Sequence, residues 1–333
     1  MSPGTDAHPD LFSEPAPPDR RPARAGARVD PIAPAADLTD LAARLPPNLR
    51  FGTSSWSFPG WRGLVYGADY PEATLARAGL DAYARHPLFR SVGVDRGYYA
   101  PVDEAVLARY AGAVDDDFRF LLKAHAALTT PRTAFRPAYL QGVPDLFLDA
   151  RHATHAVIEP ARRAMGERLG VVLFQFPPMP PQVWPHRVRL LGRLHDFLTA
   201  LPPGPVYALE WRDAEILGGD YHAMLADAPA VHAPCSHPRM PPVDEQGVDP
   251  AASRALVIRW LLGHGRGYDE AREAYAPFDR LVEPDVETRQ RIVDMLAAAT
   301  RAGREGLVIV NNKAEGSAPL SVVELARSVL SGR

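Results

Sequence analysis

Eight short apolar runs, most of them followed by a segment with helical spacing, constrain the fold of this 333-residue chain more than any other feature. The runs lie at residues 49–56, 89–99, 118–125, 170–178, 206–213, 230–237, 255–265 and 306–316. In the first four and the last two runs, apolar residues occupy positions of both parities, which is typical of parallel strands buried on both faces. The sixth run is the weakest, because it contains Pro234 and few β-branched residues.

The segments between the runs resemble amphipathic helices. Trp184, Val188, Leu191, His195 and Leu198 recur every three or four residues and predict one stripe of a helix. A strand followed by a helix, repeated about eight times over about 285 residues, predicts an α/β protein with a TIM (β/α)8 barrel, whose usual length is about 250 residues. A doubly wound open sheet is the alternative.

Residues 1 to about 47 are rich in Pro, Ala, Arg and Asp and contain few large apolar side chains. Such a segment has little apolar surface to bury against the entropy cost of ordering, so it predicts a disordered N-terminal tail. The barrel domain is then expected to span residues 48–333.

The charge and the cysteine content exclude several classes of protein. A formal net charge of −3 argues against a dedicated nucleic-acid-coating protein, although binding through a local basic patch stays open. Cys235 is the one cysteine, so no intramolecular disulfide is expected and a reducing, cytoplasmic location fits best. The N-terminus does not resemble a signal peptide, and no window approaches about 18 consecutive apolar residues, so no membrane segment is expected.

Polar or aromatic side chains lie near the ends of most of the runs. Burying a polar group without a partner costs about 1–3 kcal/mol, so these residues require a reason. In a barrel, the carboxyl ends of the strands surround the mouth of the active site. The residues predicted to converge there are Trp56, Asp95, Lys123, Gln175, Glu210, Arg212, Arg259, His264 and Asn312.

Lys123 and Lys313 are the two lysines of a chain that contains 35 arginines, and both lie at predicted strand exits. Arginine keeps its proton in a protein, whereas a buried ammonium can lose it. A site that needs a compact point charge, a tunable base or an imine-forming amine would therefore retain lysine. The alternatives are chance or a simple ion pair, and Lys313 could begin a solvated loop.

Alternation along a strand predicts further pairs of neighbouring side chains. Lys123 and His125 are expected on one face, as are Glu210 and Arg212. The second pair is either a structural ion pair or an acid/base carboxylate beside an anion-binding guanidinium. Arg259 interrupts an apolar run, so it must be paired with a carboxylate or directed at an anion.

Seven ordered sequence blocks resemble the YecE-like family, domain of unknown function 72, over about residues 50 to 330. The blocks are FGTSSWSFPGWRG, VGVDRGYYAPV, FRFLLKAHAALT, LGVVLFQFPP, YALEWRD, VIRWLLGHGRGY and VIVNNKAEGSAP. The resemblance implies a TIM barrel, comparable at the level of fold with xylose-isomerase-like and endonuclease-IV-like barrels, and implies no settled activity. The nine strand-exit residues named above fall on positions of the family pattern.

Two blocks depart from common family patterns. The second block commonly reads closer to VEINSTFY, so Asp95 and Arg96 stand where a carboxylate and small polar residues are usual. The sixth block commonly has an Arg-x-His-Gly pattern, whereas four residues separate Arg259 from His264 here.

The strand-exit residues favour an enzyme that acts on a small molecule bearing a phosphate or a carboxylate. Arg212, Arg259 and Lys123 would hold the anion, and Glu210 and Lys123 are the predicted catalytic residues, with Glu210 as general base or acid. Trp56 would wall the pocket, while Gln175 and Asn312 would orient hydroxyl groups, with Asp95 and His264 as further binding residues. The reaction class stays open among hydrolysis, isomerisation and lyase chemistry.

Three other functions remain as alternatives. One is a nucleic-acid-binding or processing protein, by analogy of fold with endonuclease-IV-like barrels. Another is a metal-dependent isomerase or hydrolase, with ligands drawn from Asp95, Glu210, His125, His232, His237 and His264, although no motif with diagnostic spacing occurs and no metal is predicted. The third is a non-catalytic scaffold. No Walker motif or strand-associated GxGxxG is present, so no cofactor is expected, and the oligomeric state stays open.

Overall fold

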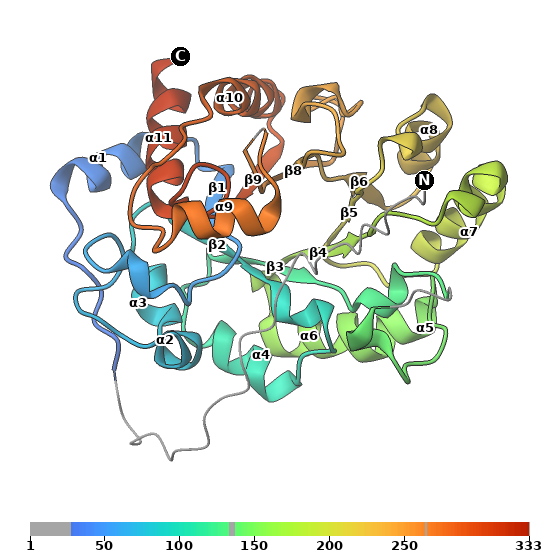
Figure 1. Cartoon of the computed structure of the whole chain (residues 1–333), viewed down its shortest axis with the longest axis horizontal. Helices are drawn as coiled ribbons and strands as arrows, with labels where there is room; N and C mark the ends of the chain where they lie inside the picture. Colours follow the sequence, from blue (N-terminus) through green and yellow to red (C-terminus); the bar gives the residue numbers. More distant parts are fainter. Residues whose placement is uncertain (1–27, 133–136, 264, 333) are drawn as a thin grey trace, which may run out of the picture.

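The computed structural model describes residues 28–132, 137–263 and 265–332. Its centre is a curled, nine-stranded parallel sheet in the form of a half-barrel, with the strand order β6-β5-β4-β3-β2-β1-β9-β8-β7 (Figure 1). The strands are β1 (Leu49–Thr53), β2 (Phe89–Val94), β3 (Arg119–Lys123), β4 (Leu169–Gln175), β5 (Val206–Glu210), β6 (Ala230–His232), β7 (Cys235–Ser236), β8 (Ala255–Trp260) and β9 (Glu305–Val310). The prediction of an α/β protein with a parallel sheet is confirmed.

The sixth apolar run forms the two edge strands of this sheet. Pro234 interrupts the run between β6 and β7, because proline has no N–H to donate to a neighbouring strand. The N–H of Ala233 donates to the carbonyl of Leu209 on β5 at 2.8 Å, and the N–H of Arg259 on β8 donates to the carbonyl of Pro234 at 2.9 Å. Two consecutive residues, Ala233 and Pro234, therefore bond to β5 and to β8, which lie next to the two opposite edges of the sheet.

Helices cover the outer face of the sheet (Figure 1). They are α1 (Ala36–Arg44), α2 (Glu72–Ala78), α3 (Leu80–Ala84), α4 (Glu104–Ala111), α5 (Ala150–His152), α6 (Glu159–Met165), α7 (Arg187–Thr199), α8 (Gly219–Asp227), α9 (Tyr268–Tyr275), α10 (Val286–Arg301) and α11 (Ala318–Ser331), with a π-helical segment, Ala153–Ile158, between α5 and α6.

Apolar side chains of the strands alternate between two cores. On β4, Val172 and Phe174 pack with the helices, whereas Val171 and Leu173 belong to a separate inner cluster. The other buried members of this inner cluster are Leu121, Ala208, Val231, Ala233, Val257, Leu307 and Ile309. Because each fully buried Leu, Ile or Val contributes about 1.5–3 kcal/mol, both faces stabilise the sheet. This is the physical reason that the runs are apolar at both parities.

The segment from residue 28 to residue 47 differs from the predicted tail. Val29 is buried at 2% exposure, the N–H of Ile32 donates to the carbonyl of Val65 at 3.0 Å, and α1 follows. Leu38 and Leu41 of α1 pack against the outer core, which offsets the entropy cost that composition alone suggested. Residues 1–27 lie outside the described residues.

The stripe predicted for residues 184–198 is confirmed for Leu191 and Leu198 and wrong for Val188 and His195. Val188 is 82% exposed, and the side chain of His195 pairs with Asp227 at 3.1 Å. The buried residues of α7 are Leu190, Leu191, Leu194, Phe197 and Leu198. Trp184 lies in a preceding 3₁₀ segment, Pro181–His186. That segment winds more tightly than an α-helix, so Trp184 does not continue the helical stripe.

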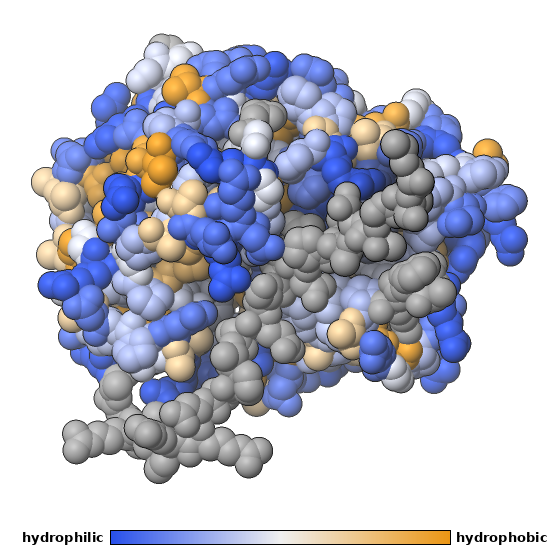
Figure 2. All heavy atoms as spheres, viewed as in Figure 1, coloured by the Kyte–Doolittle hydropathy of each residue, from blue (hydrophilic) through white to orange (hydrophobic). Residues whose placement is uncertain are grey.

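The surface in Figure 2 is mostly hydrophilic, with apolar residues scattered over it and one apolar group over α1 and α11. Among the described residues, the exposed large apolar side chains are Val188, Val282 and Val286. Within the same part of the chain, none of the helices has the length and apolarity required to span a bilayer.

Candidate functional site

Polar side chains continue the inner face of the sheet beyond its apolar cluster. Lys123 is paired in register with Leu173, and Arg259 with Ile309, and both partners belong to the inner cluster. Gln175 is paired with Glu210. Because side chains alternate along a strand, all four of these polar side chains face inward at the carboxyl ends of β3, β4, β5 and β8. The strand register therefore places these four predicted strand-exit residues on one inner face, at the same end of the sheet.

Glu210 lies between two arginines, and all three side chains are 0% exposed. One carboxylate oxygen, Oε1, accepts a hydrogen bond from Nη2 of Arg212, and Oε2 accepts from Nε of Arg259 at 3.0 Å. Burial alone would raise the pKa of Glu210, but the charges of Arg212, Arg259 and Lys123 outweigh it and lower that pKa. The carboxylate is therefore ionised at neutral pH, with both of its oxygens engaged.

Arg259 has two nitrogens that this ion pair does not use. Nη2 lies 3.6 Å from Oδ1 of Asp95, but within the described residues neither Nη1 nor Nη2 makes a hydrogen bond. Nε of Arg212 is also buried and makes no hydrogen bond within the described residues. A buried donor that lacks an acceptor costs about 1–3 kcal/mol, and more when the group is charged. Three buried guanidinium nitrogens thus remain available to an acceptor that is not part of the described chain.

Lys123 is 0% exposed. Its ammonium nitrogen lies 4.6 Å from the centroid of the Tyr98 ring, a distance at which the ring face attracts a cation. Burial lowers the pKa of Lys123 to about 8; Asp95 and Glu210 oppose this shift, and the two arginines add to it. At pH 7 roughly a tenth of the molecules then carry a neutral amine at this position.

Asp95 and Lys313 complete the cluster on its outer side. The side chain of Asp95 is 19% exposed, so solvent reaches the cluster there. Lys313 is 6% exposed, and its Nζ lies 4.0 Å from the centroid of the Tyr268 ring. Burial lowers the pKa of Lys313 to about 8 with help from Arg272, while Asp95 opposes the shift. The charge of Asp95 thus acts on both lysines, and Lys313 is buried and does not begin a solvated loop.

Gln175 is a further predicted strand-exit residue on the inner face of the sheet. It is 3% exposed, and its Oε1 has no hydrogen-bond partner within the described ranges. Its register position beside Glu210 places its side chain on the same inner face of the sheet as that of Glu210. Gln175 therefore adds an acceptor to a cluster that is otherwise rich in donors.

Two predicted site residues, Trp56 and Asn312, are not part of this cluster. Trp56 packs in the outer core, where its Nε1–H donates to the carbonyl of Leu75 at 3.1 Å and its ring meets Tyr110 edge to face. Oδ1 of Asn312 accepts from Nε1 of Trp61 at 3.1 Å and from the N–H of Ala318 at 2.9 Å, so its acceptor oxygen serves α11. His264 lies outside the described residues.

Asn312→Ala is expected to lower the free energy of unfolding by about 1–3 kcal/mol, because it leaves the buried donors of Trp61 and Ala318 without an acceptor. Urea denaturation measures this. Asn311→Ala is the control, since the side chain of Asn311 accepts one local hydrogen bond, from the N–H of Lys313. Equal losses for both variants would show that Asn312 does not hold α11 to the η1 turn, Pro59–Trp61.

Two of the histidines proposed as metal ligands, His232 and His125, have other partners. His232 is hydrogen-bonded to the hydroxyl of Tyr221 and to Oε1 of Gln246, and His125 faces His152. Burial lowers the pKa of His237 to about 3. Across the ranges that the structure describes, no group of three or more His, Cys, Asp or Glu side chains is placed to hold a metal ion.

Cys235 is a member of the site that the sequence interpretation missed. Nη1 of Arg212 donates to its Sγ at 3.2 Å, and burial raises the pKa of the thiol to about 12. The thiol is therefore a neutral neighbour that orients Arg212. The register pairs Cys235 with Arg259, so a correct strand alignment of the sixth and seventh runs would have placed it here.

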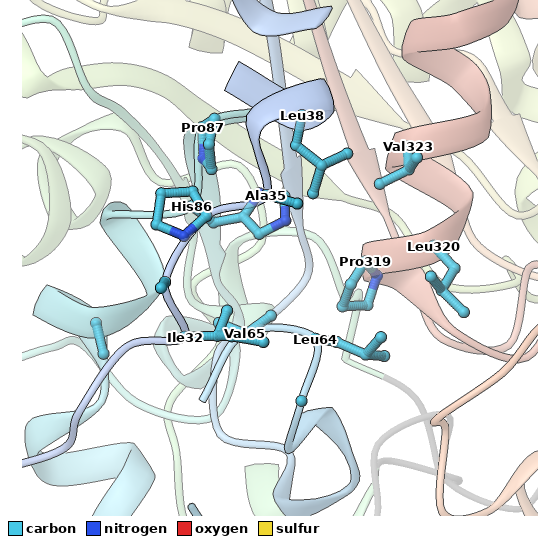
Figure 3. Close-up of a pocket in the computed structure, with 14 residues that line it drawn as sticks. Ile32, Ala35, Leu38, Leu64, Val65, His86, Pro87, Pro319, Leu320 and Val323 are labelled. Carbon is cyan, nitrogen blue, oxygen red and sulfur yellow. The ribbon is translucent and has the colours of Figure 1, made fainter. Parts of the chain in front are cut away.

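A pocket of about 130 Å³ lies elsewhere, between the segment around α1 and the start of α11 (Figure 3). Ile32, Leu38, Leu64, Leu320 and Val323 contribute to its lining. None of the charged residues of the inner face lines this pocket. It is separate from the charged cluster.

Solved structures of low sequence identity share the fold. A DUF72 family protein of Thermotoga maritima is 20% identical with a TM-score of 0.56, covering 85% of this chain and 99% of that one. A DUF72 family protein of Enterococcus faecalis is 19% identical with a TM-score of 0.53, covering 85% and 95%. No curated protein sequence matches this chain. The predicted resemblance is confirmed: the chain belongs to DUF72, described as a protein of unknown function, whose sequence profile matches residues 50–332.

Proposed function

We propose that this protein is an enzyme that binds a small anionic molecule, bearing a phosphate or a carboxylate, at the carboxyl ends of its strands. One observation carries the proposal: Arg259 is fully buried, yet Nη1 and Nη2 make no hydrogen bond within the described residues. A planar guanidinium matches two oxygens of a phosphate or carboxylate, and such charge-assisted bonds are among the stronger ones in proteins. An anion would therefore supply the hydrogen-bond acceptors that Nη1 and Nη2 of Arg259 do not find among the described residues.

Glu210 has a positioning role in this proposal. Both of its oxygens are engaged by Arg212 and Arg259, and its lowered pKa leaves it a weak base at neutral pH. Its charge instead holds the two guanidiniums in place. Lys123, with a pKa lowered to about 8, is better matched to proton transfer near neutral pH than Glu210.

We also propose that the sheet closes into a (β/α)8 barrel through its sixth strand. The support is the pair of bonds at Pro234: Ala233 bonds to β5 and Pro234 bonds to β8. Closure would surround the charged side chains with strands on all sides. It would make the cluster a mouth of the type at which TIM-barrel enzymes act.

A small ligand fits this cluster better than a polynucleotide. Lys123, Glu210, Arg212 and Arg259 are each 0% exposed, whereas proteins that track nucleic acid backbones present their cations along an open groove. Binding to DNA or RNA with a steep dependence on salt would favour the nucleic-acid alternative instead.

Arg259→Lys is expected to weaken binding of inorganic phosphate or sulfate by about ten-fold or more, because lysine cannot donate two parallel bonds. Isothermal titration at constant ionic strength measures the affinity. Arg289→Lys is the matched control, since Arg289 also pairs with a buried glutamate, Glu315, outside this cluster. Equal affinities for the wild type and Arg259→Lys would overturn the proposal.

A further inference from the structure

Anion binding alone does not explain why a lysine stands at position 123. Arg212 and Arg259 already bring two buried guanidiniums to the cluster. The chain uses arginine for 35 of its 37 basic residues. Of Lys123, Arg212 and Arg259, Lys123 is the residue whose side chain can give up its proton in a protein.

The surroundings of Lys123 raise the fraction of its neutral amine, although the ammonium remains the major form at pH 7. The side chain is fully buried and lies against the face of Tyr98. Burial together with the charges of Arg259 and Arg212 brings the pKa of its ammonium down to about 8. A desolvated lysine beside other cations is the environment in which proteins use an amine as a nucleophile towards carbonyl groups.

Asp95 links this amine to the anion-binding guanidinium. Its Oδ1 lies 3.6 Å from Nη2 of Arg259, and its charge acts on the ammonium of Lys123. Asp95 is also the member of the cluster that solvent reaches. A ligand whose anionic group lies on Arg259 would therefore have its neighbouring atoms near both Lys123 and Asp95.

We propose that Lys123 forms an imine with the carbonyl carbon of an oxo acid or an oxo-phosphate whose anionic group is bound by Arg259. This inference rests on the function proposed above and names the substrate class of the same site. An imine withdraws electrons from the adjacent carbon, which suits lyase and isomerase chemistry among the predicted reaction classes.

The step is balanced without a further reactant. The neutral amine of Lys123 attacks the carbonyl carbon and forms a C–N bond. The C–O bond then breaks, and the oxygen leaves as water with the two protons that the amine loses. Asp95 carries these protons between nitrogen and oxygen. Nothing is oxidised or reduced, so the products are the imine and one water molecule.

Trapping with sodium borohydride tests the inference on the full-length chain. Borohydride reduces an imine to a stable amine, so incubation with pyruvate or dihydroxyacetone phosphate should leave a covalent label. Peptide mass spectrometry should find the label on Lys123 and not on Lys313, a second buried lysine whose pKa is also lowered to about 8. Lys123→Arg should lose the label, and excess inorganic phosphate should reduce it.

Absence of label on Lys123 with both compounds, or equal labelling of the two lysines, would overturn the imine. The proposed function has a separate readout. If phosphate binds in an Arg259-dependent manner while no imine is trapped, the imine fails and the anion-binding enzyme stands. If phosphate does not bind but Lys123 is selectively labelled, the anion-binding role of Arg259 fails instead.

Discussion

Glu210→Gln is expected to lower the free energy of unfolding by about 3–5 kcal/mol, because it removes the carboxylate that is hydrogen-bonded to two fully buried guanidiniums. Glu210 bonds to Arg212 through one oxygen and to Arg259 through the other. Glutamine keeps the shape but has no charge, so Arg212 loses its ion-pair partner and Arg259 keeps the more distant Asp95, at 3.6 Å. Urea denaturation at pH 7 measures the loss.

The pH dependence of this loss has a definite sign. The pKa of Glu210 is lowered in the folded protein, so its contribution to stability is fully present above the ordinary carboxyl pKa. That contribution disappears as the pH falls through the folded pKa. The difference between the wild type and Glu210→Gln should therefore be largest at neutral pH and shrink in acid.

Glu104→Gln provides the control for a glutamate–arginine pair at the surface. Glu104 bonds to Arg163 with both oxygens, but their side chains are 46% and 57% exposed. Solvent screens such a pair, so little change in stability is expected. A loss for Glu210→Gln no larger than that for Glu104→Gln would contradict the buried ion pair.

Lys123→Met is expected to raise the free energy of unfolding at pH 7 by about 3 kcal/mol, because it removes a charged group held in a desolvated site. The pKa of Lys123 is about 8 in the folded protein, against an ordinary value of 10.5. Between these values the unfolded chain binds more protons than the folded one. The wild type should therefore gain stability relative to Lys123→Met as the pH rises from about 8 towards 10.5.

The measurement is a series of denaturation curves from pH 7 to pH 10 for the two proteins. Lys313 remains in both, so its own titration cancels in the difference. Arg85→Met is the control, because Arg85 is exposed, pairs with Asp81 and stays charged over this range. A difference between the wild type and Lys123→Met that does not change with pH would show that the ammonium has an ordinary pKa.

Local patterns predicted the sheet well. The runs at 118–125 and 170–178 contain β3 and β4, because side chains of both parities are apolar and each strand face has a core to enter. The polar residues that end these runs were expected to lie close together, and the register places Lys123 and Gln175 on the same inner face of the sheet.

Other predictions depended on contacts that the local pattern does not contain. Trp56 and Asn312 lie at strand exits, but each uses its polar group within the core. The partner of Asn312 is Trp61, 251 positions earlier in the chain. The segment 28–47 is ordered through its contacts with residues after it, such as Val65. Composition is a local property and does not report such contacts.

The sequence by itself determined the repeated strand and helix, the two cores of the sheet and the set of polar residues that end the strands. These follow from periodicity, since the side-chain direction along a strand is set by the backbone. The tertiary structure decided that Glu210 pairs with two arginines, one of them 49 positions away, and that Arg259 keeps buried donors without acceptors among the described residues. Charges and hydrogen bonds act over a few ångströms of space, and only the packing of strands brings such groups together.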